Sequence, residues 1–271
     1  MVKKESLVSG EYPAIFTAQD TPLKARSMLI KKIIWWVSLP LFLLLIPQAI
    51  YVKRTTLRLP EADGERAHKP NNAELNMLHA GESTVAGVGV QDLKQGLTAQ
   101  LANQIKDHSS KEVAWHIYGV NGIKIKELNV ILEQRCPKKN YQFAIITLGV
   151  NDTTKLTSLK NWHHQLKNLV RIVQKESKIP VIFTQVPPMA QFPALPAPLK
   201  YFLGLRSHLL DLELQRFCHH TKDVFYVGSE LEVAREMMAE DGYHPSALGY
   251  ENWAARLLPD ITQILNEQKS G

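Results

Sequence analysis

The chain has 271 residues, of which 45% are hydrophobic and 21% charged, so it can form one domain with a sizeable core beside any membrane segment. The formal net charge of +6 is unevenly distributed: residues 71–271 carry 21 Lys and Arg against 20 Asp and Glu, and the excess lies in residues 1–32 and 53–70. This balance argues against nucleic-acid binding, which requires a basic face on the folded domain. It favours anionic lipid headgroups as the partner of the basic flanks.

An apolar segment over Ile33–Val52 reads IIWWVSLPLFLLLIPQAIYV and contains no charged residue. It is about as long as a helix needs to be to cross a bilayer, and basic residues bound it on both sides. We therefore predict an N-terminal tail over residues 1–32 and one transmembrane helix over residues 33–52 that contacts membrane lipid.

A cleaved signal peptide is the alternative interpretation of this segment. Its charged n-region would be unusually long, at about 30 residues, and no A-x-A-like site follows the apolar run. We expect an uncleaved anchor, with the domain that follows it on the extracytoplasmic side, although the flanking Lys and Arg do not decide the orientation. Residues 53–72 are polar and contain Pro60, Gly64 and Pro70, which predicts a linker before a domain over residues 73–271.

From residue 73 onward, short apolar runs alternate with longer helical patterns. The predicted strands are Leu75–Ala80, Glu112–Tyr118, Gln142–Leu148, Pro180–Gln185 and Val224–Val227. The predicted helices are Gln91–Asp107, Ile123–Gln134, Leu156–Glu176, Tyr201–His219 and about Ala247–Glu267. This alternation predicts an α/β fold in which helices cover both faces of a parallel sheet of five strands.

Polar and glycine-containing segments follow the predicted strands. They are Gly81–Thr84, Gly119–Gly122, Gly149–Asp152, the proline-rich loop over residues 186–200 and, after a short helix, Asp241–His244. Ligands of such sheets bind beyond the carboxyl ends of the strands, so all five segments should open onto one edge.

Two of these segments supply the parts of a nucleophilic site. An Asp three residues before a His on a tight turn lets the carboxylate of Asp241 orient the imidazole of His244. Ser83, on a turn between a strand and a helix, offers a hydroxyl that this imidazole can activate. We predict Ser83, Asp241 and His244 as catalytic residues.

Three backbone or amide donors complete the predicted site as an oxyanion hole. Gly122 lets its N–H group approach a substrate without a Cβ in the way, Asn151 offers a side-chain amide, and the N–H of Ser83 is the third donor. Each motif alone is also an ordinary turn sequence. Their order after successive strands is what indicates a function.

These residues resemble the SGNH/GDSL hydrolase superfamily, whose blocks are Gly-Asp-Ser, an isolated Gly, Gly-x-Asn-Asp and Asp-x-x-His. The resemblance covers about residues 74–266. It implies a flavodoxin-like three-layer α/β/α sandwich and a serine esterase or lipase that forms an acyl-enzyme, with the roles predicted above. One departure is that Glu82 stands in place of the usual Asp of the nucleophile turn.

The loop over residues 186–204 is apolar and contains five prolines. It is expected either to wall an acyl-binding groove or to pack as a rigid loop on the helix that follows. The predicted substrate-binding side chains are those of Met189, Phe192, Leu195 and Leu199. Together with membrane tethering, they favour a lipid-like or acylated substrate.

Other functions remain open on the sequence alone. They are a cell-envelope polysaccharide O-acetylesterase, an O-acyltransferase and, because of Glu82, a catalytically weak binding protein on the same scaffold. The spacing of Cys136, Cys218 and the histidines indicates no metal site, and we predict no cofactor and no obligate protein partner. Whether the two cysteines pair is not decided by the sequence.

Overall fold

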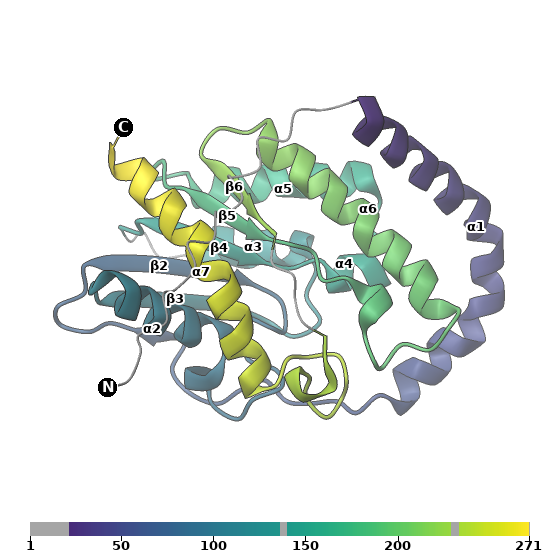
Figure 1. Ribbon diagram of the computed structural model, residues 1–271, viewed down its shortest axis with the longest axis horizontal. Coiled ribbons are helices and arrows are strands. Elements are labelled where there is room, and N and C mark those ends of the chain that lie inside the picture. The colour runs from purple at the N-terminus through teal and green to yellow at the C-terminus, as the bar shows by residue number, and fades with distance from the viewer. Residues whose placement is uncertain (1–21, 136–139, 229–232, 271) are drawn as a thin grey trace, which may run out of the picture.

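A computed structural model describes residues 22–135, 140–228 and 233–270 and is built around one six-stranded sheet (Figure 1). The strands are β1 Ala67–His68, β2 Leu75–Gly81, β3 Val113–Gly119, β4 Phe143–Thr147, β5 Val181–Thr184 and β6 Val224–Val227. Their order across the sheet is β1-β3-β2-β4-β5-β6, and all neighbouring pairs are parallel except β1 with β3. The five predicted parallel strands are confirmed, and β1 is an antiparallel addition at the edge.

Long helices cover both faces of the sheet, as the alternation predicts. They are α2 Leu97–Ser109, α3 Ile125–Arg135, α5 Leu159–Val173, α6 Leu199–His219 and α7 Ala247–Ser270. The apolar side chains of α2 and α7 share one core cluster with the sheet, and those of α3, α5 and α6 share the cluster on the other face. The three-layer sandwich is thereby confirmed (Figure 1).

Shorter helical segments lie at the carboxyl edge and in the loops. They are α4 Val150–Thr154 and the 3-10 segments η1 Leu93–Gln95, η2 Met189–Gln191 and η3 Arg235–Met237. Their placement matters because α4 carries Asn151 and η2 lies in the proline-rich loop.

The predicted linker over residues 53–72 is in large part packed on the domain. The N–H of Asp63 donates to the C=O of Gln91 at 2.9 Å, Ala62 is buried, and β1 pairs with β3 through Ala67 and His116. Polar composition and turn residues describe a connecting segment by itself, but they do not reveal that the open edge of β3 will take it as a partner.

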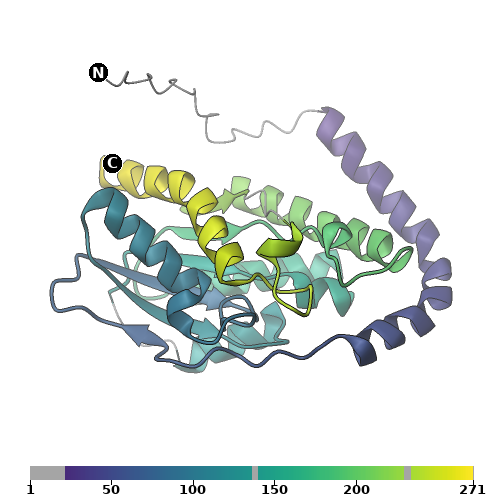
Figure 2. The same ribbon diagram turned by 60° about the horizontal axis from the view of Figure 1, so that its bottom comes forward.

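The first helix, α1 Pro22–Thr55, lies along α6 on the outside of the sandwich (Figures 1 and 2). The ring of Phe202 on α6 lies 4.6 Å from the rings of both Trp35 and Phe42. The side chain of Gln48 accepts from the N–H of Leu199 at 3.1 Å and donates to the C=O of Ala197 at 2.9 Å. This helix is therefore seated on the domain by apolar and polar contacts.

The structure does not confirm the transmembrane helix that the sequence predicts over residues 33–52. Within the described residues, no single helix has both the length and the apolar character needed to span a bilayer. The halves Ser27–Pro40 and Phe42–Thr55 meet those criteria only as a pair, and they are bent by 79° where they join. The bend follows Pro40, and a proline inside a helix removes a backbone hydrogen bond and favours a kink.

Candidate active site

The strand order brings three of the predicted segments together. Strand β2 lies between β3 and β4, so the turn with Ser83 after β2 has the segment with Gly122 on one side and the segment with Asn151 on the other. The chain reverses its direction of winding at this point of the sheet, which is where open α/β sheets form ligand crevices.

The structure also brings the segment with His244 back to this edge of the sheet. Ser83 Oγ lies 2.8 Å from His244 Nε2, and His244 Nδ1 lies 2.6 Å from Asp241 Oδ2. Ser83 and Asp241 are buried, and His244 is half-buried. The three side chains are in hydrogen-bond reach in the order in which a base activates a nucleophile and a carboxylate orients the base.

The second oxygen of Asp241 fixes this carboxylate in place. Asp241 Oδ1 accepts from the backbone N–H groups of Tyr243 at 2.9 Å and His244 at 3.0 Å. Burial raises the pKa of Asp241, but the hydrogen bond and charge of His244 together with these N–H groups outweigh burial and hold the pKa below its ordinary value. The carboxylate therefore stays ionised at neutral pH.

The backbone that follows Ser83 lies directly against the segment that carries His244. Gly89, at φ +105°, lies against the C=O of Pro245, where a Cβ would clash with that oxygen. The hydroxyl of Tyr250 donates to the C=O of Val88 at 2.6 Å. Gly89 is not among the predicted site residues, although the repeated glycines at residues 87 and 89 are a signal for a strained turn.

Two of the predicted oxyanion donors are backbone N–H groups, those of Ser83 and Gly122. Gly122 has φ +76°, and no atom lies within 4 Å of the position of its absent Cβ. No acceptor among the described residues takes the backbone N–H of Ser83 or that of Gly122. These two donors are therefore available to a developing oxyanion.

Glu82 holds the third donor. Its carboxylate accepts from the backbone N–H of Val150 at 2.9 Å and from the backbone N–H and side-chain Nδ2 of Asn151 at 3.0 and 2.6 Å. The side chain is only 2% exposed, and burial raises its pKa to about 7, although the three hydrogen bonds oppose that shift. One hydrogen of the Asn151 amide is thereby fixed by Glu82, which leaves the other for a substrate oxygen.

Further residues that the sequence analysis missed hold the segment over residues 119–122. Glu61 accepts from the N–H of Asn121 at 2.7 Å, and Arg66 donates to both Glu61 and the C=O of Gly119 at 2.5 Å. Both charged side chains come from the predicted linker, where nothing in the sequence connects them with Gly122.

Asp152, on α4 next to Asn151, connects this helix with the start of α3. Its carboxylate accepts from the N–H of Ile125, at the start of α3, at 3.0 Å and from Thr157 Oγ1 at 2.7 Å. The sequence signal for this residue is the Asp of Gly-x-Asn-Asp, which the motif alone gives no role.

The predicted substrate-binding side chains do not line an open groove. Those of Met189, Phe192, Leu195 and Leu199 are at most 4% exposed. They form one apolar cluster with residues of α1 and α6, including Trp35 and Phe202. The alternative interpretation, a rigid loop packed on the following helix, describes this segment better, because α1 and α6 both cover it.

Two further buried residues, His79 and Cys218, are of types that can ligate metals. His79 is buried between the hydroxyls of Thr98 at 2.8 Å and Thr147 at 3.0 Å, and burial lowers its pKa to about 3. Cys218 is a buried free thiol, and Cys136 lies outside the described residues. Among residues 22–135, 140–228 and 233–270, no group of three His, Cys, Asp or Glu side chains is arranged to hold a metal ion.

The GDSL-like Lipase/Acylhydrolase family matches residues 80–251, which include every residue of the candidate triad and oxyanion hole. The chain belongs to this family. GDSL-like enzymes of this family are ester-hydrolysing serine hydrolases, and the contact between Ser83 and His244 is the arrangement that this chemistry needs. No curated protein matches the chain.

Solved structures of GDSL-like and other esterases share the fold. A family 3 carbohydrate esterase from Clostridium thermocellum has 15% identity and a TM-score of 0.56, with 72% of this chain and 98% of that one covered. The psychrotrophic esterase EstA from Pseudoalteromonas sp. has 18% identity and a TM-score of 0.54, with 71% and 100% covered. An acetyl xylan esterase from Geobacillus stearothermophilus has 14% identity and a TM-score of 0.52, with 70% and 95% covered.

Proposed function

We propose that this GDSL-like enzyme hydrolyses carboxylic esters through an acyl-enzyme on Ser83. The observation that carries the proposal is the 2.8 Å contact between Ser83 Oγ and His244 Nε2, with Asp241 behind the imidazole at 2.6 Å. As Ser83 Oγ attacks the ester carbonyl, His244 takes the hydroxyl proton, and the ionised Asp241 stabilises the resulting imidazolium.

The N–H groups of Ser83 and Gly122 and the amide of Asn151 would stabilise the oxyanion of the tetrahedral intermediate. His244 then gives its proton to the departing alkoxide oxygen, and the alcohol leaves behind an ester between the acyl group and Ser83. Water repeats the attack with His244 as base, which releases the carboxylic acid and restores the Ser83 hydroxyl.

For the substrate, we favour an acylated molecule with a short acyl group over a long-chain lipid. The four loop side chains expected to wall an acyl groove are buried under α1 and α6. They therefore provide no exposed apolar surface on which a long acyl chain could bind. Two solved structures with this fold carry the names of carbohydrate and acetyl xylan esterases, which favours an O-acetyl ester of a cell-envelope polysaccharide as a specific candidate.

We further propose that α1 holds the enzyme at a membrane, with the catalytic domain on the extracytoplasmic side. Support comes from its apolar side chains on the face away from α6, such as Val37 and Leu44, which are 70% and 75% exposed. A reporter fused to the C-terminus, active on one side of the membrane only, tests the orientation.

The test of the chemistry is hydrolysis of p-nitrophenyl esters from acetate to palmitate by the full chain and by Ser83→Ala. We expect turnover that Ser83→Ala abolishes and that falls as the acyl chain lengthens. Asn151→Ala should remain folded and slow turnover on the order of 100-fold, the usual effect of losing one oxyanion donor. Turnover that is the same in Ser83→Ala and the wild type at every chain length would refute the proposal.

A further inference from the structure

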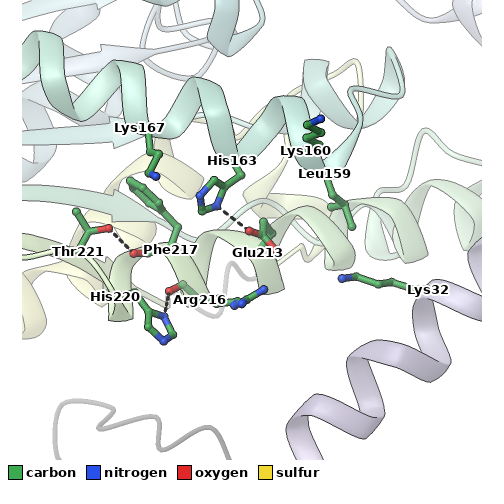
Figure 3. A pocket seen from close by; sticks show the side chains of 10 residues that line it. All are labelled: Lys32, Leu159, Lys160, His163, Lys167, Glu213, Arg216, Phe217, His220 and Thr221. Atoms are coloured by element: carbon green, nitrogen blue, oxygen red, sulfur yellow. Dashed lines mark hydrogen bonds and ion pairs between the residues drawn. The ribbon is translucent and has the colours of Figure 1, made fainter.

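A cavity lies on the outside of the sandwich, between α1, α5 and α6 (Figure 3). Its volume is about 560 Å³, which is in the usual range for ligand sites, roughly 300–1,000 Å³. No residue that lines it belongs to the candidate triad or to the oxyanion hole. The ester chemistry therefore leaves this cavity unexplained.

Basic residues line the cavity from all three helices. Lys32 comes from α1, Lys160 and Lys167 come from α5, and Arg216 comes from α6. Within the described part of the chain, no carboxylate lies in ion-pair distance of any of these four side chains. An anion bound in this cavity would interact favourably with these charges.

The single acidic residue that lines the cavity already has a partner. Glu213 is 7% exposed, and its Oε1 lies 2.8 Å from His163 Nδ1 (Figure 3). The backbone oxygens at the end of α6 are also engaged, since the hydroxyl of Thr221 donates to the C=O of Phe217 at 2.7 Å. The negative groups of the site are thus paired, while its cations are not.

We propose that this cavity binds a phosphate group, as a monoester or diester. The guanidinium of Arg216 matches two phosphate oxygens at once, and the three ammonium groups add point charges that neutralise a dianion. Lys32 enters the site only because α1 is seated on α6, where Trp35 contacts Phe202. The site is therefore complete only in the full chain.

The phosphate can belong to a lipid headgroup or to a soluble compound, because both present the same oxygens. The position of Lys32 on the apolar helix α1 favours a headgroup, since basic residues beside membrane-bound segments attract anionic lipids. The inference does not depend on ester hydrolysis, so either can fail without the other.

The test uses the full chain in an uncharged detergent and titrates inorganic phosphate by calorimetry at constant ionic strength. The variants are Lys160→Gln and Arg216→Gln, and the matched controls are Lys126→Gln and Lys178→Gln, which change exposed lysines outside the cavity. Each cavity variant should weaken binding about fivefold, the effect of one cation near contact at a surface, and each control should leave it unchanged. Turnover of p-nitrophenyl acetate should be unchanged in all four.

A second arm measures flotation of the same proteins with vesicles of phosphatidylcholine alone or with 30% phosphatidylglycerol. A cavity-dependent gain from phosphatidylglycerol without binding of inorganic phosphate assigns the site to lipid headgroups, and binding of inorganic phosphate without that gain assigns it to soluble phosphates. Equal behaviour of cavity and control variants in both arms overturns the inference, as does the absence of binding in both.

Discussion

At the scale of single residues, Glu82 is where the nucleophile turn of this chain departs from the usual Gly-Asp-Ser. Its carboxylate is buried and accepts three hydrogen bonds from the segment that carries Asn151. The carboxylate of this residue, which replaces the usual Asp, accepts from the amide of Asn151, the proposed oxyanion donor. We infer that Glu82 is a positioning residue that acts through Asn151.

Burial of Glu82 also predicts how stability depends on pH. Its pKa is about 7 in the folded protein and 4.5 ordinarily, so its contribution is fully present below pH 4.5 and is lost as the pH rises to about 7. Relative to Glu82→Gln, the wild type should lose up to about 3 kcal/mol of unfolding free energy between pH 4.5 and 7.5. Urea unfolding at a series of pH values measures this.

The control for that measurement is Glu133→Gln, which changes an exposed carboxylate on α3. Its unfolding free energy should follow the wild type across the same pH range. Parallel curves for Glu82→Gln and the wild type would mean that Glu82 does not titrate as its burial requires.

At the level of elements, the oxyanion segment after β3 is held by the chain that precedes β2. Glu61 accepts the N–H of Asn121, and Arg66 binds both Glu61 and the C=O of Gly119. The segment with Gly122 therefore depends on a connection that runs along the edge of the sheet at β1. This is a reason for the polar residues 61–68 to pack on the domain.

Removal of this support should affect catalysis more than folding. In Glu61→Ala the loop over residues 119–122 loses one hydrogen bond and the partner of Arg66, so kcat for p-nitrophenyl acetate should fall about tenfold with little change in KM. Glu65→Ala, an exposed neighbour on the same segment, is the matched control and should leave kcat unchanged. An equal effect of the two substitutions would show that Glu61 does not position the loop.

The whole molecule presents one unusual surface, the outer face of α1. Its exposed apolar side chains include Trp36, Val37, Leu43 and Leu44, while Lys53 and Arg54 stand at its C-terminal end. The opposite face packs on α6, so the helix is apolar on both sides. Large exposed apolar patches of this kind mark interaction or membrane-binding sites.

A charge on the outer face should therefore weaken membrane binding. We expect Val37→Glu to reduce flotation of the full chain with vesicles at least tenfold, because a carboxylate is costly in an apolar lipid environment. Val130→Glu on α3, where the valine is 50% exposed, is the matched control and should leave flotation unchanged. Flotation that survives Val37→Glu and a second charge at Leu44 would exclude the outer face of α1 as the membrane-binding surface.

The sequence by itself determined the alternation of strands and helices and the residues that meet at the carboxyl edge. Ser83, Gly122 and Asn151 follow successive parallel strands, and the local period of apolar residues is enough to place such strands. Adjacent parallel strands end at one edge, so the convergence of these residues follows from their order.

Only the tertiary structure decided what covers the loop over residues 186–204 and what holds the oxyanion segments. Met189 and Phe192 have the same apolar character in a groove wall and in a core, and burial under α1 distinguishes the two. Likewise, Glu61 and Glu82 act on residues 60 or more positions away. Local sequence patterns do not reveal such contacts, because the contacts depend on which elements pack together in space.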